Sequence, residues 1–474
     1  MSARRTLAAA LAAAALGCAI GPNYERPELP APPAFRDQAE ATSSLADLPW
    51  WEVFHDDVLV ALIHESLDNN RDLAVAAANV ETARYRAAVQ RGELFPQLGY
   101  EADAFRGNDT TLGAPTQGRA TDNDFLAAAN VFWEIDIWGR IRRASEAARA
   151  QLFASDAFRR GVVLSLVSGV AQAWYELLEL DRELAIARDS VASFQETHDL
   201  FERQFRGGVV SKLDPLRAQA ALAQAAARVP DLERQVVAKE NELSVLLGRP
   251  AGPIPRGGAL ETQTVPPEVP AGVPALLLER RPDLIEAEQL LVAANAGEGV
   301  ALAGYFPRLG LTAVAGSLST ELSDLLDAGT GFYAAGGQAL GPLFTFGQTT
   351  YTWKAAQAAT VASRAAYEGS VLTSLREVSD ALTAREKLVV ARAEKEREVA
   401  ALRESVDVSQ KRYLGGLATY LEVLDAQQQL YPAEFELVQI ERDQLLAVVQ
   451  LYRALGGGWG QAPEAPEVPL PIAP

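Results

Sequence analysis

The 474-residue sequence has few cysteines, histidines and aromatic residues. It contains one cysteine, Cys18, three histidines and 7% aromatic residues. A single cysteine excludes a disulfide within the chain. The histidines form no His-Glu-x-x-His motif and no cysteines lie at ligand spacing, so we expect no metal site. Because phosphate-binding loops and Gly-x-Ser-x-Gly motifs are also missing, we expect no catalytic residues and no cofactor, in a protein that is not an enzyme.

The sequence also lacks an excess of positive charge and lacks long apolar runs. It has 43 Lys and Arg against 62 Asp and Glu, which gives a net charge of −19. Nucleic-acid binding needs cations at the phosphates, so no nucleic-acid partner is expected. No segment after the N-terminus has the roughly 18 consecutive apolar residues typical of a membrane-spanning helix. Any membrane crossing by the mature chain would therefore use β-strands.

The N-terminus resembles a secretory signal. Arg4 and Arg5 precede an apolar stretch, Leu7 to Leu16, that is too short to span a bilayer. It ends in Ala-Leu-Gly-Cys, which resembles a lipobox with Cys18 as the residue that carries the lipid. We therefore expect residues 1–17 to be a signal peptide and residues 18–55 a lipidated N-terminal segment. The alternative is ordinary signal cleavage beside an incidental cysteine.

What the sequence does contain is a duplication. FRGGVVSKLDPLRAQAAL at Phe205–Leu222 matches YLGGLATYLEVLDAQQQL at Tyr413–Leu430, 208 residues later (413 − 205). Phe95-Pro96 recurs as Phe306-Pro307, and several other landmarks repeat in the same order. A single large unit is therefore present twice. The expected segments are a first repeat at 56–249, a linker at 250–274, a second repeat at 275–457 and a Pro-rich tail at 458–474.

Each repeat has the same internal order. A first helix, 57–93 or 275–304, ends before a proline. A β-hairpin follows, at about 96–137 or 307–345. A long helix then runs over 139–205 or 347–412, and the double glycine separates it from a last helix. At 1.5 Å per residue the long helix would extend roughly 100 Å, which is typical of coiled coils.

The hairpin regions change to a period of two. In Phe125–Ile137 every odd position is apolar, while Asn130 and Glu134 lie between them. This alternation predicts a strand with one apolar and one polar face, long enough to cross a membrane. The facing of the fourth strand, near Gly329–Leu343, is unclear from its Gly-rich sequence. Four strands cannot close a barrel, so several chains must combine, and three copies would give twelve strands. The fold class is therefore α+β.

Five motifs together resemble one family. They are Gly21–Pro27, Trp50–Phe54, Asn69–Leu73, Arg280–Leu284 and Val423–Gln427. Their order resembles the lipoprotein branch of the TolC-like outer-membrane efflux proteins, the branch similar to NodT and OprM, over almost the whole chain after the signal.

This resemblance implies a fold and a function. It implies a homotrimer whose twelve-stranded β-barrel lies in outer-membrane lipid and whose helices form an α-barrel tunnel in the periplasm. It also implies a lipid-anchored exit duct of a tripartite efflux pump that passively conducts small molecules such as drugs. A periplasmic adaptor and an inner-membrane transporter, of the RND type, would open its periplasmic end.

The resemblance also implies site residues. The two glycine turns would lie at the periplasmic tip and contact the adaptor. The residues implied there are Gly207, Gly208, Val209, Ser211, Gly415, Gly416, Leu417 and Thr419. Leu421 and Asp425 match the family's gate segment and are four residues apart, on one helix face. Arg217 occupies the position of Asp425 in the first repeat and would help to hold the closed state.

Several alternatives remain open from the sequence. The helices alone would also suit a lipid-anchored coiled-coil rod that links envelope layers. Within a channel, a type I protein-secretion duct is the alternative to small-molecule efflux. For the sites, the alternatives are a plain helix–helix turn with no partner at the glycines, and a helix cap or an interhelical pair at Asp425. The sequence does not identify the exported substrate, the adaptor or the transporter.

Overall fold

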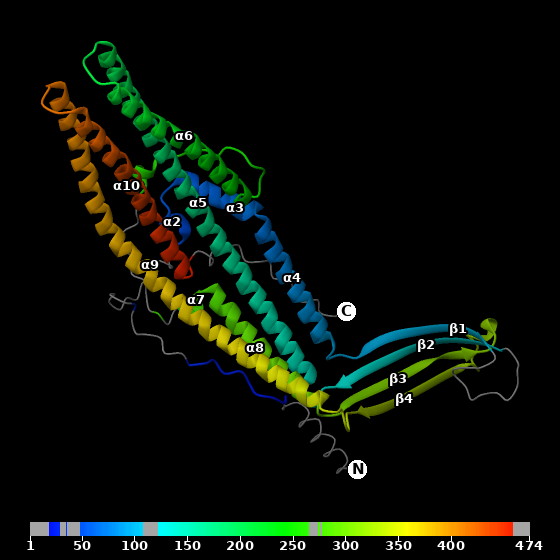
Figure 1. Cartoon of the computed structure of the whole chain (residues 1–474). Helices are drawn as coiled ribbons and strands as arrows, with labels where there is room; N and C mark the ends of the chain where they lie inside the picture. The colour runs from blue at the N-terminus through cyan, green and yellow to red at the C-terminus, as the bar shows by residue number, and fades with distance from the viewer. Residues whose placement is uncertain are drawn as a thin grey trace.

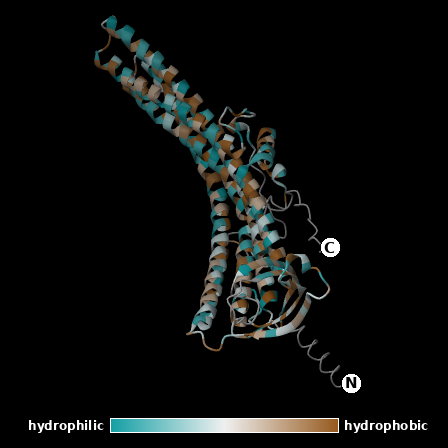
Figure 2. Cartoon of the chain, turned by 90° about the vertical axis from the view of Figure 1, so that its right-hand side faces the viewer, coloured by the Kyte–Doolittle hydropathy of each residue, from teal (hydrophilic) through white to brown (hydrophobic). Residues whose placement is uncertain are grey.

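The computed structural model shows an elongated molecule with helices at one end and a sheet at the other (Figure 1). It describes residues 19–28, 35, 48–107, 122–264, 274 and 277–457. The predicted signal peptide, Cys18 and the Pro-rich tail at 458–474 lie outside the described residues. Figure 2 shows the same rod after a quarter turn, with the two helical hairpins at the end opposite the strands.

The helices occur in two similar sets. The first set is α2 Trp50–Val53, α3 Asp57–Asn69, α4 Arg71–Gly92, α5 Arg140–Arg206 and α6 Leu213–Leu246. The second set is α7 Leu277–Arg280, α8 Pro282–Ala303, α9 Gln348–Leu414 and α10 Tyr420–Ala454, and two short 3-10 turns are Leu260–Thr262 and Leu322–Asp324. Helices α5 and α9 each have 67 residues. The two long helices expected from the sequence are thus confirmed, each about 100 Å long at 1.5 Å per residue.

The expectation of one continuous first helix in each repeat is wrong. The chain is extended at Asn70, whose side-chain oxygen accepts a hydrogen bond from the Leu73 amide at 3.0 Å and so caps α4. Its Nδ2 donates to the Leu246 carbonyl at 3.0 Å, which fixes the bend against α6. In the second repeat the break is at Arg281, directly before Pro282. A residue before proline is forced out of the helical conformation, so the helix restarts there.

Glycines with positive φ confirm the duplication at the level of the backbone. Of the seven such glycines in the described residues, all but Gly21 form three pairs, each 208 residues apart (347 − 139, 416 − 208, 456 − 248), namely Gly139 and Gly347, Gly208 and Gly416, and Gly248 and Gly456. The first pair starts the two long helices, the second ends them, and the third ends α6 and α10. Glycine adopts this left-handed conformation without steric cost. Each repeat therefore needs the same three backbone reversals.

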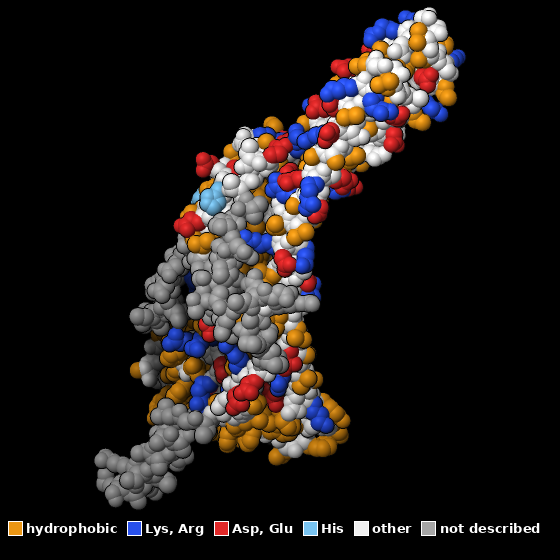
Figure 3. Space-filling view, turned by 90° about the vertical axis from the view of Figure 1, so that its left-hand side faces the viewer, with side chains coloured by type: hydrophobic (Ala, Val, Ile, Leu, Met, Phe, Trp, Pro, Cys, Tyr) orange, Lys and Arg blue, Asp and Glu red, His pale blue; other side chains and the backbone are white. Residues whose placement is uncertain are grey.

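The sheet is antiparallel, in the order β1-β2-β3-β4. Its strands are β1 Gln97–Gly107, β2 Asp122–Ile135, β3 Arg308–Ser319 and β4 Gly331–Leu340. The register places Tyr100, Ala129, Ala315 and Tyr333 in one row across all four strands. The alternating apolar positions of β1, β2 and β3 therefore share one face, as the sequence predicted, although apolar residues such as Phe132 and Phe332 lie on the other face. Figure 3 shows hydrophobic side chains gathered at the end opposite the helical tips.

The register also settles the fourth strand. Ala335 pairs with Ala313 and Ala339 with Leu309, both on the apolar face of β3. Gln338 lies on the other face with Gly310. The Gly-rich β4 thus has Ala335 and Ala339 on the apolar face of β3, whereas its other side carries Gln338 together with Phe332 and Leu340.

The main core lies midway along the helices, where α5 crosses α3 and α10. Trp174 is fully buried there, and its indole N–H donates to Asp56 Oδ2 at 3.1 Å. Asp56 also caps α3 by accepting from the Val58 and Leu59 amides. Among the described helices, α5 alone has a stretch long and apolar enough to cross a membrane, and 67% of that stretch is buried inside the protein. The apolar stretch of α5 therefore belongs to this core.

The segment 19–28 is fastened to the start of α5 and to α8. Arg143, which is 4% exposed, donates to the Gly21 carbonyl at 3.1 Å and to Asn23 Oδ1 at 2.8 Å. Glu288 on α8 accepts from the Tyr24 hydroxyl at 2.9 Å and pairs with Arg26. The chain directly after Cys18 is therefore held beside the junction of the helices and the sheet.

Candidate functional site: the helical tips and the gate segment

Each helical hairpin turns through the same hydrogen-bonded cap. In the first hairpin the Gly208 amide donates to the Phe205 carbonyl at 2.9 Å, and the Val209 amide to the Gln204 carbonyl at 2.9 Å. In the second, the corresponding bonds run from Gly416 to Tyr413 at 3.0 Å and from Leu417 to Arg412 at 2.8 Å. This pair of bonds is the Schellman motif, which requires a left-handed residue at its centre. Gly208 and Gly416 supply that residue, with φ of 72° and 69°.

The helices after the turns start in different ways. Ser211 Oγ accepts from the Leu213 amide at 3.2 Å, and Asp214 Oδ2 accepts from the Ser211 amide at 3.2 Å. This reciprocal pair is a capping box. At the second turn Thr419 precedes α10 without a side-chain cap, and Arg412 instead donates to the Leu417 carbonyl at 3.4 Å. The two turns share their glycines but differ in polar chemistry, so they present different surfaces.

The tips expose apolar side chains. Val209 is 74% exposed and Leu417 is 75% exposed. Leu414 and Leu213 beside them are also exposed. No atom lies within 4 Å of a Cβ built at Gly208 or Gly416, so both turns project into open space. Each tip therefore presents an exposed apolar side chain that no other part of the described chain covers.

Just behind the tips a small core joins the two hairpins. The rings of Phe201 on α5 and Tyr420 on α10 lie 4.1 Å apart, and Val423 and Leu424 are buried in the same cluster. Burial raises the pKa of Tyr420 to about 12, so its phenol is neutral at physiological pH. The Tyr413 hydroxyl donates to Gln204 Oε1 at 2.8 Å and ties the end of α9 to the end of α5. The hairpins are thus held together within one chain.

The predicted gate residues lie on the opposite side of α10 from this core. Leu421 is 57% exposed and Asp425 is exposed, whereas Val423 and Leu424 between them are buried. Asp425 Oδ2 accepts from Gln429 Nε2, one turn further along, at 2.7 Å. Leu421 and Asp425 therefore form one exposed stripe on the side of α10 that faces away from the tip core.

Arg217 is exposed on α6 and has no ion pair within the described part of a single chain. The structure therefore does not join Arg217 to an acid of the same chain. An ion pair that holds the closed state would have to involve another copy.

Several polar contacts between the hairpins were not predicted from the sequence. Gln427 is fully buried and its Nε2 donates to Ser193 Oγ at 3.0 Å. Arg442 donates to the buried carboxylate of Glu179 at 2.6 and 2.7 Å, joining α10 to α5. The sequence carried one usable signal, because Gln427 follows Ala426 on the apolar face of α10, where a solvated side chain is not expected. Across the described residues, no group of three or more His, Cys, Asp and Glu is placed to hold a metal ion.

The burial of Glu179 beside Arg442 predicts that the stability of the folded chain depends on pH. Burial raises the pKa of Glu179 to about 7, although the guanidinium of Arg442 opposes this shift. The folded chain therefore binds a proton that the unfolded carboxyl, with a pKa near 4.5, has released. The free energy of unfolding is expected to be largest below pH 4.5 and to fall as the pH rises toward 7, by about 3 kcal/mol at most.

This dependence is measured as the thermal midpoint at several pH values for the native chain and for Glu179→Gln. The amide cannot titrate, so the decline over this window should shrink in the variant. Arg442 keeps a partner there, because it also pairs with Asp443 at 2.7 Å. Identical profiles for the two proteins would show that Glu179 is ionised throughout.

A matched pair of glycines tests the turn geometry. Gly416→Val places a β-branched residue at φ 69° and is expected to cost about 1–2 kcal/mol locally. Gly415→Ala, at φ −79°, is expected to be neutral or slightly stabilising, because that conformation is helical. Hydrogen exchange of the amides at positions 416 and 417 should be faster in the first variant alone. Equal protection in both variants would contradict this reading of the turn.

Comparisons with known proteins agree with this architecture. The family model described as "Outer membrane efflux protein" matches the chain twice, at residues 62–249 and 273–457. The probable efflux pump outer membrane protein TtgC of Pseudomonas putida is 34% identical over 469 residues, which cover 96% of each chain. The cation efflux system protein CusC of Escherichia coli is 30% identical over 463 residues, covering 97% of this chain and 100% of the relative.

A solved structure shows the same fold. The open state of the MtrE outer membrane channel of Neisseria gonorrhoeae has a TM-score of 0.83 and 30% identity, over 93% of this chain and 99% of that one. TtgC and CusC are efflux proteins and MtrE is a channel, so these relatives favour an efflux duct over a structural rod. The chain therefore belongs to the outer membrane efflux protein family, and it is an outer-membrane channel that extends into the periplasm and serves as the exit duct of an efflux pump.

Proposed function

We propose that three copies of this chain form the channel, with each sheet contributing four of twelve barrel strands. The support is the strand order of the sheet. β1 and β4 are its two outer strands, and each pairs with a neighbour on one side only within the chain. Unpaired strand edges are not tolerated in lipid, so β1 of one copy would pair with β4 of the next. The apolar face shared by all four strands would then contact lipid.

The helices of the three copies would form a tunnel in the periplasm, closed near its tip. The support for a gate is the exposed stripe of Leu421 and Asp425, which faces away from the core of its own chain. Three copies would place a ring of leucines next to a ring of carboxylates. Arg217 would then be free to pair with an acid of a neighbouring copy and stabilise the closed state.

The tips would receive a periplasmic adaptor. Val209 and Leu417 are exposed apolar residues at the far end of two rigid hairpins, where a partner can bury them. Gly207, Gly208, Gly415 and Gly416 would shape the turns, and Ser211 and Thr419 would add polar contacts at the starts of α6 and α10. An inner-membrane transporter of the RND type would act through the adaptor, and its docking would open the gate.

Cys18 would carry a lipid that anchors the chain to the outer membrane. The support is the lipobox-like sequence and the position of the segment that follows it. The Ile20 amide donates to the Trp138 carbonyl at 3.0 Å, at the junction of the sheet and α5. The anchor would therefore lie close to the membrane surface that the barrel creates.

The transported molecules would be small, such as drugs, and would pass without chemical change. The relatives include an antibiotic efflux pump protein and a cation efflux protein, so the duct architecture serves more than one substrate class. The transporter would select the substrate and the duct would conduct it. The observation that carries the proposal is the pair of exposed tips at one end and the sheet with one apolar face at the other.

The adaptor role is tested with charged tip variants. Val209→Asp together with Leu417→Asp should abolish efflux in cells that depend on this chain, because a carboxylate in a buried apolar contact is strongly unfavourable. Val245→Asp is the matched control, since Val245 is 71% exposed but lies at the other end of α6. The mass of the purified oligomer should be the same in all three proteins. Normal efflux by the double variant would rule out docking at these turns.

A further inference from the structure

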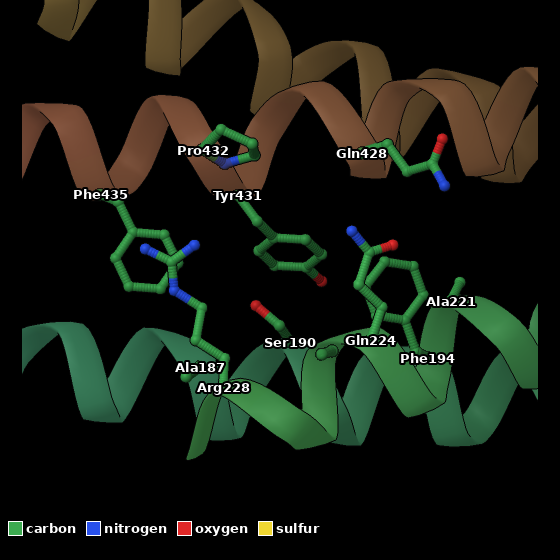
Figure 4. Close-up of a pocket in the computed structure, with 11 residues that line it drawn as sticks. Ala187, Ser190, Phe194, Ala221, Gln224, Arg228, Gln428, Tyr431, Pro432 and Phe435 are labelled. Carbon is green, nitrogen blue, oxygen red and sulfur yellow. The ribbon is translucent and has the colours of Figure 1, made fainter. Parts of the chain in front are cut away.

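A recess lies between α5, α6 and α10, further from the tips than the gate stripe (Figure 4). Its volume is about 130 Å³. The aromatic side chains of Phe194, Tyr431 and Phe435 form much of its wall. Alanines at 187, 221 and 225 lie among them, and their small side chains leave the space open. The recess therefore has the composition typical of a small-molecule site, mainly apolar with a few polar groups.

One cation lies at the edge of this recess. The guanidinium carbon of Arg228 lies 4.0 Å from the centre of the Phe435 ring, a cation–π contact that Figure 4 shows face on. In the described part of the chain Arg228 has no ion pair or hydrogen bond, and stacking on a ring leaves the N–H groups at its edge available. Gln224 and Gln428 are the neighbouring polar residues of the wall.

The recess faces the same side as the gate. Along α10, Leu421, Asp425, Gln428, Pro432 and Phe435 follow one another at alternating steps of four and three residues. Residues at this spacing lie on one face of a helix in a coiled coil. Along α6, Arg217, Ala221, Gln224 and Arg228 follow the same steps. If the gate residues face the bore of the trimer, the recess opens into the same bore. It then lies about 16 Å from Leu421 along α10, on the side away from the tips, at 1.5 Å per residue.

The volume of the recess and the positive charge of Arg228 indicate which class of ligand fits. A dry protein cavity of about 150 Å³ accommodates benzene, so this recess fits one aromatic ring. A guanidinium binds a carboxylate through two parallel hydrogen bonds. We propose that the recess is a binding site for monocyclic aromatic carboxylates, with the ring between Tyr431 and Phe435 and the carboxylate on Arg228.

This site would add a substrate class to the proposed function. It rests on the proposed function, because only the proposed trimer places the recess in the bore. A molecule held there would wait directly above the closed gate. Three copies would supply three such sites around the bore, and these would favour the passage of aromatic anions although the chain as a whole carries a net charge of −19. Arg228 would provide the local attraction that offsets this charge.

The test is binding of 4-fluorobenzoate to the purified full-length protein in detergent, followed by fluorine NMR. We expect saturable binding with one site per chain. Arg228→Gln should weaken binding about tenfold, the loss typical of a charge-assisted hydrogen bond. Ala225→Leu should abolish it by filling the recess. Arg234→Gln is the matched control, since Arg234 is 70% exposed and lies on another face of the same helix.

The neutral analogue 4-fluorobenzamide separates charge from packing. It should bind the native protein about tenfold more weakly than the carboxylate, and equally to native and Arg228→Gln proteins. Unchanged affinity for 4-fluorobenzoate in both Arg228→Gln and Ala225→Leu, or no saturable binding to the native protein, would overturn the proposal. Binding needs no ion flow, so its absence beside normal conductance would remove this site and leave the channel assignment intact.

Discussion

Replacing Leu421 and Asp425 together by alanine is expected to raise the single-channel conductance of the protein several-fold. Both side chains are exposed on one face of α10, and neither belongs to the buried tip core of their own chain. In a trimer they would form the narrowest rings of the bore. Alanine removes the bulk of the leucine ring and the charges of the carboxylate ring, so ions meet a wider and less selective passage.

The measurement is conductance in planar bilayers, with the oligomer mass determined on the same preparation. Asp425→Ala alone should raise the conductance by a smaller factor than the double variant. Glu422→Gln is the control, because Glu422 is next to Leu421 but faces Arg412, 3.7 Å away. Conductance that stays at the native value in a trimeric double variant would place the gate elsewhere.

Trp174→Ala is expected to have the largest effect on stability, a loss of about 3–5 kcal/mol. The side chain is fully buried in the central core, between α5 and the start of α3. Its removal leaves a large cavity and also takes a hydrogen bond from Asp56, which caps α3. The loss should therefore spread from α5 to the packing of α3.

The thermal loss of helical circular dichroism measures this effect in the purified protein. Trp174→Phe retains most of the volume and should cost less, since it removes chiefly the bond to Asp56. Trp51→Ala should cost less than Trp174→Ala, because Trp51 is 39% exposed. A Trp174→Ala protein that melts at the native temperature would show that this core contributes little to the stability of the helices.

The tip turns show how sequence and structure complement each other. The double glycines predicted a chain reversal, and the structure confirms it at Gly208 and Gly416. The roles of Leu421, Asp425 and Arg217 remain predictions, because they depend on a second and third copy. What the structure adds is that Leu421 and Asp425 face away from their own core, which a gate requires.

Contacts between distant segments were beyond the sequence. Gln427 with Ser193, Tyr413 with Gln204 and Arg442 with Glu179 join residues more than 200 positions apart. A polar residue in a helical pattern looks the same whether it meets water or a buried partner. Only the packing of α10 against α5 distinguishes the two cases.

Local chemistry explains what the sequence determined by itself. The two long helices, the glycine turns and the alternating strands follow from steric preferences and periodicities within a few neighbouring residues, and the 208-residue repeat follows from comparing the sequence with itself. The break at Asn70 was missed because its cap and its contact with Leu246 compete with a good helical pattern.

The tertiary structure decided the rest. The facing of β4 followed from its register with β3, since a strand of glycines and alanines has too little amphipathic pattern to fix its own sides. The recess beside Arg228 exists because three helices meet around small side chains. Neither feature is encoded locally, because register and cavities are properties of how elements pack and not of any single element.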